Sequence, residues 1–383
     1  MKLARVALLR ELPLKDDRGC PFSYWVPDSA LEELHKIDME LGGHLGSPSQ
    51  AVNSADRDRY MIRSIMEEAI ASSQIEGAAT TRRIAKEMLK TGRPPRDKSE
   101  HMILNNYRTI RWLREHKDEP LTRDLLLGIQ GRMTASTLDD ADAAGRFRLP
   151  SEKIAVFDDR DGEVTHTPPP AEELEERLIL LYDFANAEET AGEFMHPVVR
   201  AMILHFWVAY DHPFVDGNGR TARALFYWYM LRKGYWLFEF LSISQFIIGA
   251  PVQYQRAFLN TETDEGDVTY FLMYHLQAIR RAREELYHYL DQQQKRNAEL
   301  LRLLKFRPGM NHRQDALLAH AIRHDGATYT IQSHEGSQGV SYQTARTDLA
   351  DLAKRGLLIE HKIGRRFHYT APPDLRERLG VGQ

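Results

Sequence analysis

The sequence has few of the residues and patterns that mark secreted, membrane-spanning and repetitive proteins. Its single cysteine, Cys20, excludes an intrachain disulfide framework and is compatible with a reducing compartment. No apolar run reaches the length of a transmembrane helix, and the N-terminus carries charges too early for a signal peptide. No internal repeat or low-complexity tract is present. We therefore expect a cytoplasmic protein with no membrane partner.

Zinc-site patterns and a strong net charge are missing as well. His196, His205 and His212 have no HExxH motif or cysteine pair beside them, so His196 and His205 are expected to be core or helix-cap residues. The formal net charge of −4 gives no overall indication of nucleic-acid binding. With 383 residues, of which 42% are hydrophobic and 28% charged, the chain is expected to form two or three globular domains.

What the chain does contain is a concentrated segment, His212 to Arg223, with the sequence HPFVDGNGRTAR. An apolar stretch that opens with Pro197 precedes it and a second apolar stretch follows, so a loop is expected to enter a helix at Gly217-Asn218-Gly219. The first backbone N–H groups of a helix lack intrahelical partners and favour anions, and glycines let the backbone approach phosphate oxygens closely. Phe214 is expected to pack inward and fix the loop.

Charged side chains flank this anion cradle. Arg220 and Arg223 are spaced i, i+3 on the first helical turn, so both guanidinium groups can face one anion. Asp216 comes just before the cradle, where a carboxylate can hold Mg²⁺ against phosphates. His212 lies at the other end of the loop, where an imidazole can take a proton from an incoming hydroxyl. Together these residues predict a site that handles a nucleotide triphosphate.

The segment resembles the signature of the Fic (filamentation induced by cAMP) family, H-x-F-x-[DE]-G-N-G-R-x-x-R, and matches it at every fixed position. The resemblance implies a mostly α-helical fold and transfer of AMP from ATP to a protein hydroxyl, with loss of pyrophosphate. It implies that His212 is the base that activates the target Tyr, Thr or Ser, and that Asp216 holds Mg²⁺. It assigns phosphate binding to Gly217, Asn218, Gly219, Arg220 and Arg223.

A second motif ends a helical stretch that is expected over about residues 55–77. Ser72, Glu76 and Gly77 occupy the fixed positions of [ST]-x-x-x-E-[GN], which resembles the inhibitory motif of autoregulated Fic proteins. The resemblance implies that Glu76 pairs with Arg223. A carboxylate there would occupy the place that the γ-phosphate needs and would repel its charge, so ATP would bind in an unproductive pose.

Two short β-rich runs, residues 153–157 and 163–167, surround an Asp/Gly-rich turn and predict a hairpin. In Fic proteins such a flap lies beside the active site and aligns the target segment by strand addition. Ile154 and Val164 are the candidates for gripping the target side chain, and an ordinary surface hairpin is the alternative. Tyr254 falls where relatives often carry paired tyrosines near the adenine, and the resemblance assigns it to nucleotide binding.

The whole chain divides into four predicted regions. An N-terminal helical region, residues 1–120, carries the inhibitory helix, and a Fic catalytic core follows over residues 121–280. Residues 281–305 are expected to form a connecting helix and residues 306–383 a winged-helix domain. Outside the inhibitory stretch, helices are expected near residues 28–41, 81–90, 99–116, 122–134, 171–186, 197–210, 219–233 and 251–262.

The C-terminal region differs in charge from the rest of the chain. Residues 301–383 hold 13 Lys/Arg against 8 Asp/Glu. A helix over residues 314–323, a second helix from a serine cap to Lys354, and a hairpin that turns at Gly364-Arg365 resemble a winged helix-turn-helix. The second helix can enter a DNA major groove with Arg365 and Arg366 near phosphate, and contact with another protein is the alternative.

These features favour a mostly α-helical, Fic-type protein adenylyltransferase with a small β-hairpin flap, held inactive by Glu76 and followed by a winged helix. ATP, a target protein and the chain itself are the expected partners, and Mg²⁺ is the expected cofactor. DNA and a second copy of the chain are further candidate partners. Two alternatives stay open: an enzyme that removes AMP or transfers another nucleotide, and a DNA-binding regulator whose Fic core senses nucleotide.

Overall fold

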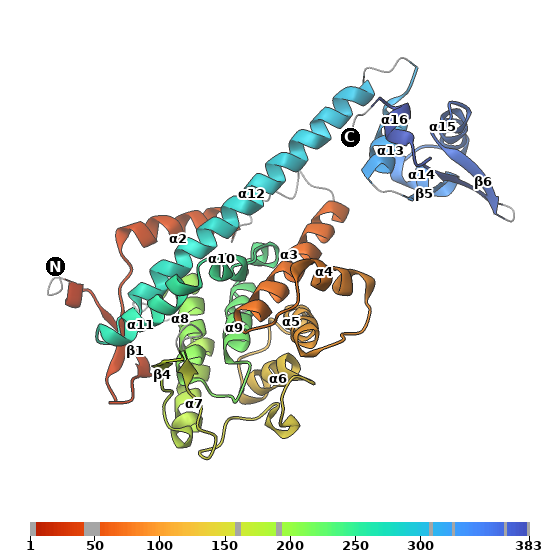
Figure 1. The fold of residues 1–383 in the computed structure, drawn as a ribbon. Coiled ribbons are helices and arrows are strands. Elements are labelled where there is room, and N and C mark those ends of the chain that lie inside the picture. Colours follow the sequence, from red (N-terminus) through yellow and green to blue (C-terminus); the bar gives the residue numbers. More distant parts are fainter. Residues whose placement is uncertain are drawn as a thin grey trace. The chain divides into compact units, whose positions relative to one another are not determined.

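The computed structural model describes residues 5–41, 54–157, 162–188, 194–305, 309–323, 326–363 and 366–380. It is mostly helical, as the sequence predicts (Figure 1). The chain divides into two compact units, residues 1–287 and 288–383. Within the described residues, no helix is both long enough and apolar enough to span a bilayer.

The first unit is built around a set of helices that agree closely with the predicted ones. They are α2 (Asp28–Leu41), α3 (Ser54–Ile75), α4 (Arg82–Thr91), α5 (Lys98–Glu115), α6 (Arg123–Thr134), α7 (Leu174–Asn186), α8 (Pro197–Asp211), α9 (Asn218–Arg232), α10 (Ser244–Ile248), α11 (Pro251–Thr263) and the start of α12 (Thr269–Lys305). Most ends lie within one or two residues of the prediction, and the first turn expected for α7 is a separate 3₁₀ turn over residues 171–173. The sequence pattern does not predict α10, which has only five residues.

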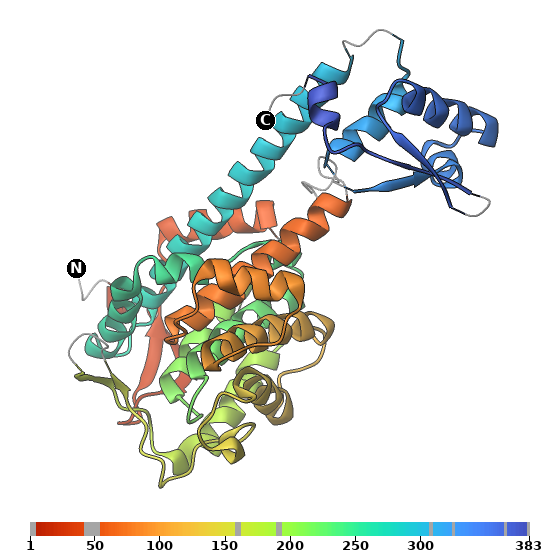
Figure 2. The ribbon, with the colours of Figure 1, turned by 45° about the vertical axis from the view of Figure 1, so that its right-hand side comes forward.

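Helices α8 and α9 form the centre of this unit. Almost every side chain of both helices is buried, because their sequences are apolar on nearly all faces. Helix α9 contacts α8, α5, α6 and α3, and Figure 2 shows it surrounded by them. His196 caps α8 by accepting a hydrogen bond from the Val198 N–H, and His205 is fully buried, so both are confirmed as cap and core residues.

Two antiparallel hairpins complete the first unit. Strands β1 (Arg10–Lys15) and β2 (Pro21–Tyr24) form a hairpin that the sequence analysis does not predict. Strands β3 (Val156–Phe157) and β4 (Val164–His166) form the predicted flap, and its turn lies outside the described residues. Among the described residues of this flap, the paired strands are shorter than the runs that the sequence predicts.

The second unit contains α13 (His312–Arg323), β5 (Thr328–Thr330), α14 (Ile331–Gln338), α15 (Tyr342–Lys354), β6 (Ile359–Ile363), β7 (Arg366–Thr370) and α16 (Leu375–Arg378). Its three antiparallel strands have the order β5-β7-β6. Three residues join α14 to α15: Gly339 has φ +62°, and Ser341 caps α15. Two helices joined by so short a turn are consistent with the predicted winged helix, which stays a prediction. The predicted turn at Gly364-Arg365 lies outside the described residues, and DNA binding stays a prediction.

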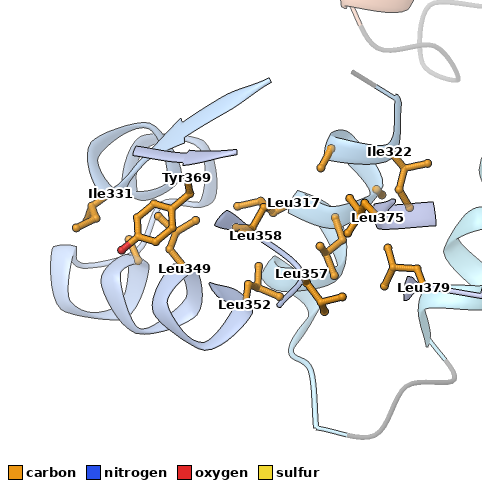
Figure 3. Packing of buried hydrophobic residues seen from close by; sticks show 14 residues of the cluster. Leu317, Ile322, Ile331, Leu349, Leu352, Leu357, Leu358, Tyr369, Leu375 and Leu379 are labelled. Carbon is orange, nitrogen blue, oxygen red and sulfur yellow. The ribbon is translucent and has the colours of Figure 1, made fainter. Parts of the chain in front are cut away.

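A hydrophobic core of its own holds the second unit together (Figure 3). Leu349 and Leu352 of α15 are fully buried against Leu317, Leu358 and Tyr369 of the surrounding elements. The exposed face of α15 carries the polar residues that α15 would present to a partner.

Replacing Leu349 by Ala should therefore destabilise the second unit by about 2–5 kcal/mol, because it leaves a cavity at a fully buried position. Hydrogen exchange of residues 312–370 in the intact chain measures this as faster opening. The exposed Tyr342 of the same helix is the control, and Tyr342→Ala should change the opening free energy by less than about 0.5 kcal/mol. Equal opening in the two variants would contradict the packing described here.

Candidate active site

His212 ends helix α8 in an unusual backbone conformation. Its φ of +46° lies in the left-handed region, which non-glycine residues rarely adopt, and it turns the chain out of α8 into the loop. The ring Nδ1 lies 3.2 Å from the carbonyl oxygen of Ala209. A carbonyl only accepts hydrogen bonds, so Nδ1 carries the proton and Nε2 keeps its lone pair. Burial lowers the pKa of His212 to about 4, so the imidazole is neutral and able to act as a base.

The loop after His212 is held by Asn218. Its side-chain oxygen accepts from the N–H of Phe214 at 2.9 Å, and its amide donates to the Phe214 carbonyl at 2.8 Å. Phe214 is fully buried and packs against Phe147, which confirms that it fixes the loop. Because the Asn218 side chain is engaged within the loop, its predicted contribution to phosphate binding rests on its backbone N–H at the start of α9.

Glu76 lies on the glycine-rich start of α9. A Cβ atom at Gly219 would come within 2.2 Å of Glu76 Oε1, so only glycine allows the carboxylate to approach this closely. Gly217, immediately before α9, has φ +84° and permits the tight turn. The predicted anion cradle is therefore a place where the structure already holds an anionic group, at the positive end of a helix.

Arg223 is the cation that pairs with the Glu76 carboxylate. Its side chain is 1% exposed; Nε donates to Ser72 Oγ at 2.8 Å, and Nη2 donates to the Ser72 carbonyl at 2.8 Å and to Glu76 Oε1 at 3.0 Å. Burial acts to lower the pKa of Arg223, but the charge of Glu76 leaves it raised. The structure thus places Ser72 and Glu76 of the predicted inhibitory motif in contact with one buried guanidinium. Gly77, with φ +88°, ends the helical segment just after Glu76.

Arg220 has different partners from Arg223. It is fully buried, and its two terminal nitrogens donate to the Met133 carbonyl and to Asp216 Oδ1, both at 3.0 Å. Because the two guanidinium groups bind different elements, their sharing of one anion stays a prediction.

Asp216 is the predicted Mg²⁺ ligand. Its side chain is 37% exposed, and the oxygen that binds Arg220 also accepts from the N–H of Gly217. Within the described part of the chain, no three His, Cys, Asp or Glu side chains gather into a metal site. One partly exposed carboxylate beside the anion cradle nevertheless fits Mg²⁺, which usually takes one or two carboxylates and completes its shell with water and substrate phosphates.

Tyr254 lies at the edge of the same charge cluster. Its hydroxyl is 2.9 Å from Nε2 of the buried His205. Burial raises the pKa of Tyr254 to about 12, with the neighbouring charges of Arg223 and Glu76 acting in opposite directions. The structure therefore brings Tyr254 to the predicted site, and its contact with adenine stays a prediction.

The flap presents an apolar edge. Val164 on β4 and Phe157 on β3 are each 55% exposed, whereas Ile154 is half-buried and precedes β3. Target gripping by Ile154 and Val164 stays a prediction.

Residues that the sequence analysis does not identify hold the site in place. The backbone N–H of Arg148 donates to the Pro213 carbonyl and its Nε to the His212 carbonyl, both at 2.9 Å, so it fastens the loop from outside. Asp211, fully buried next to His212, accepts from Arg177 at 2.8 Å and from Trp207 at 3.0 Å. Trp207 lies one helical turn before Asp211, but the contacts of Arg148 and Arg177 join residues 64 and 34 positions apart, which no spacing signals.

Glu68 is another missed residue, and it anchors the helix that carries Glu76. It is 3% exposed and accepts from the hydroxyls of Tyr227 at 2.9 Å and Ser242 at 3.0 Å, and from the Ser244 N–H at 3.0 Å. Helix α3 is thus bound to α9 and α10 about two turns before Glu76, which keeps the carboxylate at the cradle.

Known proteins are similar to this chain in sequence. Residues 120–230 match the model of the Fic/DOC family. The chain is 27% identical over 219 residues to the protein adenylyltransferase Fic of Nematostella vectensis, covering 54% of this chain and 48% of that protein. It is 28% identical over 226 residues to the protein adenylyltransferase fic-1 of Caenorhabditis elegans, covering 57% and 40%. The chain therefore spans less than half the length of these relatives.

Solved structures share the fold. A crystal structure of a Fic family protein from Desulfovibrio desulfuricans G20 matches with a TM-score of 0.59 and 20% identity, covering 91% of this chain and 97% of that one. Residues 134–508 of Fic-1 from C. elegans match with a TM-score of 0.53 and 23% identity, covering 69% and 72%. The similarity confirms the predicted Fic-type helical fold.

The neutral state of His212 predicts how stability changes with pH. The pKa of His212 is about 4 in the folded chain and about 6.5 in an unfolded one, so the unfolded state takes up the proton first as the pH falls. This contribution destabilises the fold progressively from about pH 6.5 down to about pH 4. His212→Gln, which cannot be protonated, should therefore lose stability less steeply over this range, as measured by urea midpoints at successive pH values. Parallel curves for the two proteins would show that His212 is not held neutral.

Proposed function

We propose that this chain, which carries a Fic/DOC domain in a Fic-type fold, is a nucleotidyltransferase that moves AMP from ATP to a hydroxyl group of a target protein and that Glu76 holds inactive. The observation that carries the proposal is the position of the Glu76 carboxylate, on Arg223 and against Gly219 at the start of α9. A site that binds a carboxylate with a buried guanidinium and a helix N-terminus also suits a phosphate. The relatives named protein adenylyltransferase support the choice of reaction.

In the proposed reaction His212 is the general base. The Nε2 lone pair takes the proton of the target hydroxyl while the hydroxyl oxygen forms a bond to the α-phosphorus of ATP. The bond from the α-phosphorus to the bridging oxygen breaks, and pyrophosphate leaves with the electron pair. Backbone N–H groups at the start of α9 and the nearby guanidinium groups face the developing negative charge.

Asp216 would hold the Mg²⁺ that accompanies ATP, at the loop end of the anion cradle. Mg²⁺ bound there would neutralise part of the charge on the phosphates. Arg220 keeps the Asp216 carboxylate in place through its hydrogen bond at 3.0 Å.

Inhibition follows from competition for one cation. Arg223 is buried and is already paired with Glu76 and Ser72, so an outer phosphate of ATP can reach it only if the carboxylate moves away. If the Glu76 carboxylate and an outer phosphate both lay against Arg223, their negative charges would repel each other strongly, because the site is screened from water. Removing Glu76 frees the guanidinium without removing any proposed catalytic group.

The test is intact-mass measurement of the purified chain after incubation with ATP and Mg²⁺. Glu76→Gly should acquire AMP at least about tenfold faster than the wild type, and Glu76→Gln, which keeps the shape without the charge, should fall between them. His212→Ala combined with Glu76→Gly should react about 10²–10⁴-fold more slowly than Glu76→Gly alone. Equal rates for the wild type and Glu76→Gly would refute inhibition by Glu76, and modification that survives the loss of His212 would refute its role as base.

Ser72 offers a second test of the inhibitory contact. Ser72→Ala removes a hydrogen bond to a buried charge, which is worth about 1.5–3 kcal/mol, and should loosen the Glu76 segment. Self-modification of Ser72→Ala should rise above the wild-type rate but stay below that of Glu76→Gly. Ser64→Ala is the matched control, because Ser64 lies on the same helix and donates to the Phe240 carbonyl instead of binding Arg223. Equal activation by both variants would mean that general loosening of α3, and not the Arg223 contact, releases the enzyme.

A further inference from the structure

His166 joins the flap to the body of the first unit. It lies on β4, and its side chain is only 10% exposed. Its Nδ1 is 3.0 Å from a carboxylate oxygen of Glu262 on α11, and its Nε2 is 2.7 Å from the carbonyl oxygen of Tyr210 on α8. The ring also packs on that of Tyr210, with centroids 4.8 Å apart. No part of the proposed chemistry uses this histidine.

The two partners of His166 determine its protonation state. The Tyr210 carbonyl can only accept a hydrogen bond, and so can the ionised Glu262 carboxylate. Both ring nitrogens must therefore donate, and this requires the doubly protonated, positively charged imidazolium. A neutral ring would leave one nitrogen lone pair facing an acceptor.

One of the two hydrogen bonds of His166 reaches the helix that ends at the proposed base, His212. Tyr210 lies in the last turn of α8, two residues before His212. In the flap, Val156 pairs with His166 and Phe157 pairs with Val164, so β4 contains one extra residue between the two pairs. Such a bulge re-aims side chains and is frequent beside active sites. Here His166 is turned onto the core while Val164 stays exposed.

We propose that His166 is a positioning residue, which as an imidazolium fastens the flap strand to α8 and α11 and so sets where a target strand added to the flap lies relative to His212. The flap's target role rests on the proposed function, whereas the two hydrogen bonds of His166 do not. The occupant of the flap edge is an extended segment of the target protein, since β4 offers backbone groups and an apolar side chain.

The charges around His166 determine the pH range over which its two hydrogen bonds persist. Burial opposes the charge of His166, but the hydrogen bond and charge of Glu262, the Tyr210 carbonyl and the charge of Asp211 leave its pKa raised. The stabilisation is therefore complete below about pH 6.5 and is lost as the pH rises through the raised pKa. His212 behaves oppositely, because burial and, less strongly, the nearby charge of His166 lower its pKa to about 4.

Hydrogen exchange of the flap residues 162–167 in the full chain, followed from pH 6 to pH 9 and corrected for intrinsic exchange, tests the proposal. Protection in the wild type should fall about tenfold or more as His166 loses its proton, corresponding to about 1.4 kcal/mol. Glu262→Gln is the matched variant, because its amide can donate to the Nδ1 lone pair of a neutral ring while Nε2–H still bonds Tyr210. Its protection should stay high and independent of pH, and His166→Phe should show low protection at every pH.

A flat wild-type profile, or an equal fall in Glu262→Gln, would overturn the assignment. The hydrogen-exchange measurements need neither ATP nor a target. Their outcome therefore does not depend on whether the chain transfers AMP. In the Glu76→Gly background, self-modification should decline at high pH, and adding Glu262→Gln should remove that decline. Identical pH profiles in the two proteins would overturn the positioning role even if the exchange results hold.

Discussion

The buried guanidinium of Arg223 is the constraint on which the site depends. A cation that is 1% exposed is costly unless it is paired and hydrogen-bonded, and the chain supplies Ser72 and Glu76 from a helix that lies about 150 residues earlier. In the proposed function a phosphate replaces the carboxylate as the partner of this charge. Phosphate binding and its inhibition would then be two consequences of one buried charge.

Rigid support of the loop complements this charge. His212 has a strained left-handed backbone, and its carbonyl is held by Arg148 while Asn218 clamps Phe214. Buried side chains and backbone hydrogen bonds over-determine the loop, so the ring of His212 keeps one tautomer and one position. The two histidines next to α8 have opposite protonation, neutral at His212 and charged at His166, because one is simply buried and the other faces two acceptors.

Prediction from the sequence succeeds where the signal is local. Periodic apolar positions and end signals locate the long helices within a residue or two, and α8 and α9 are identified by their nearly continuous apolar sequences. It fails for α14, whose sequence IQSHEGSQ is polar and contains a glycine, so no apolar face marks it as a helix. The hairpin of β1 and β2 is missed as well. An Asp/Gly turn joins its strands, but Pro13 and Pro21 argue against strands on sequence alone.

For the site, the sequence by itself determines the loop and the first turn of α9, because His212, Asp216, the two glycines and both arginines are contiguous and their spacing is read directly. The motif resemblance adds Glu76 as a candidate partner of Arg223. Only the tertiary structure decides how Arg148, Glu68 and His166 act. Arg148 binds His212, 64 residues away, and Glu68 binds Ser244, 176 residues away. The two partners of His166 lie 44 and 96 residues from it. Hydrogen bonds and charge pairs of this kind depend on three-dimensional approach, which leaves no periodicity or spacing in the chain.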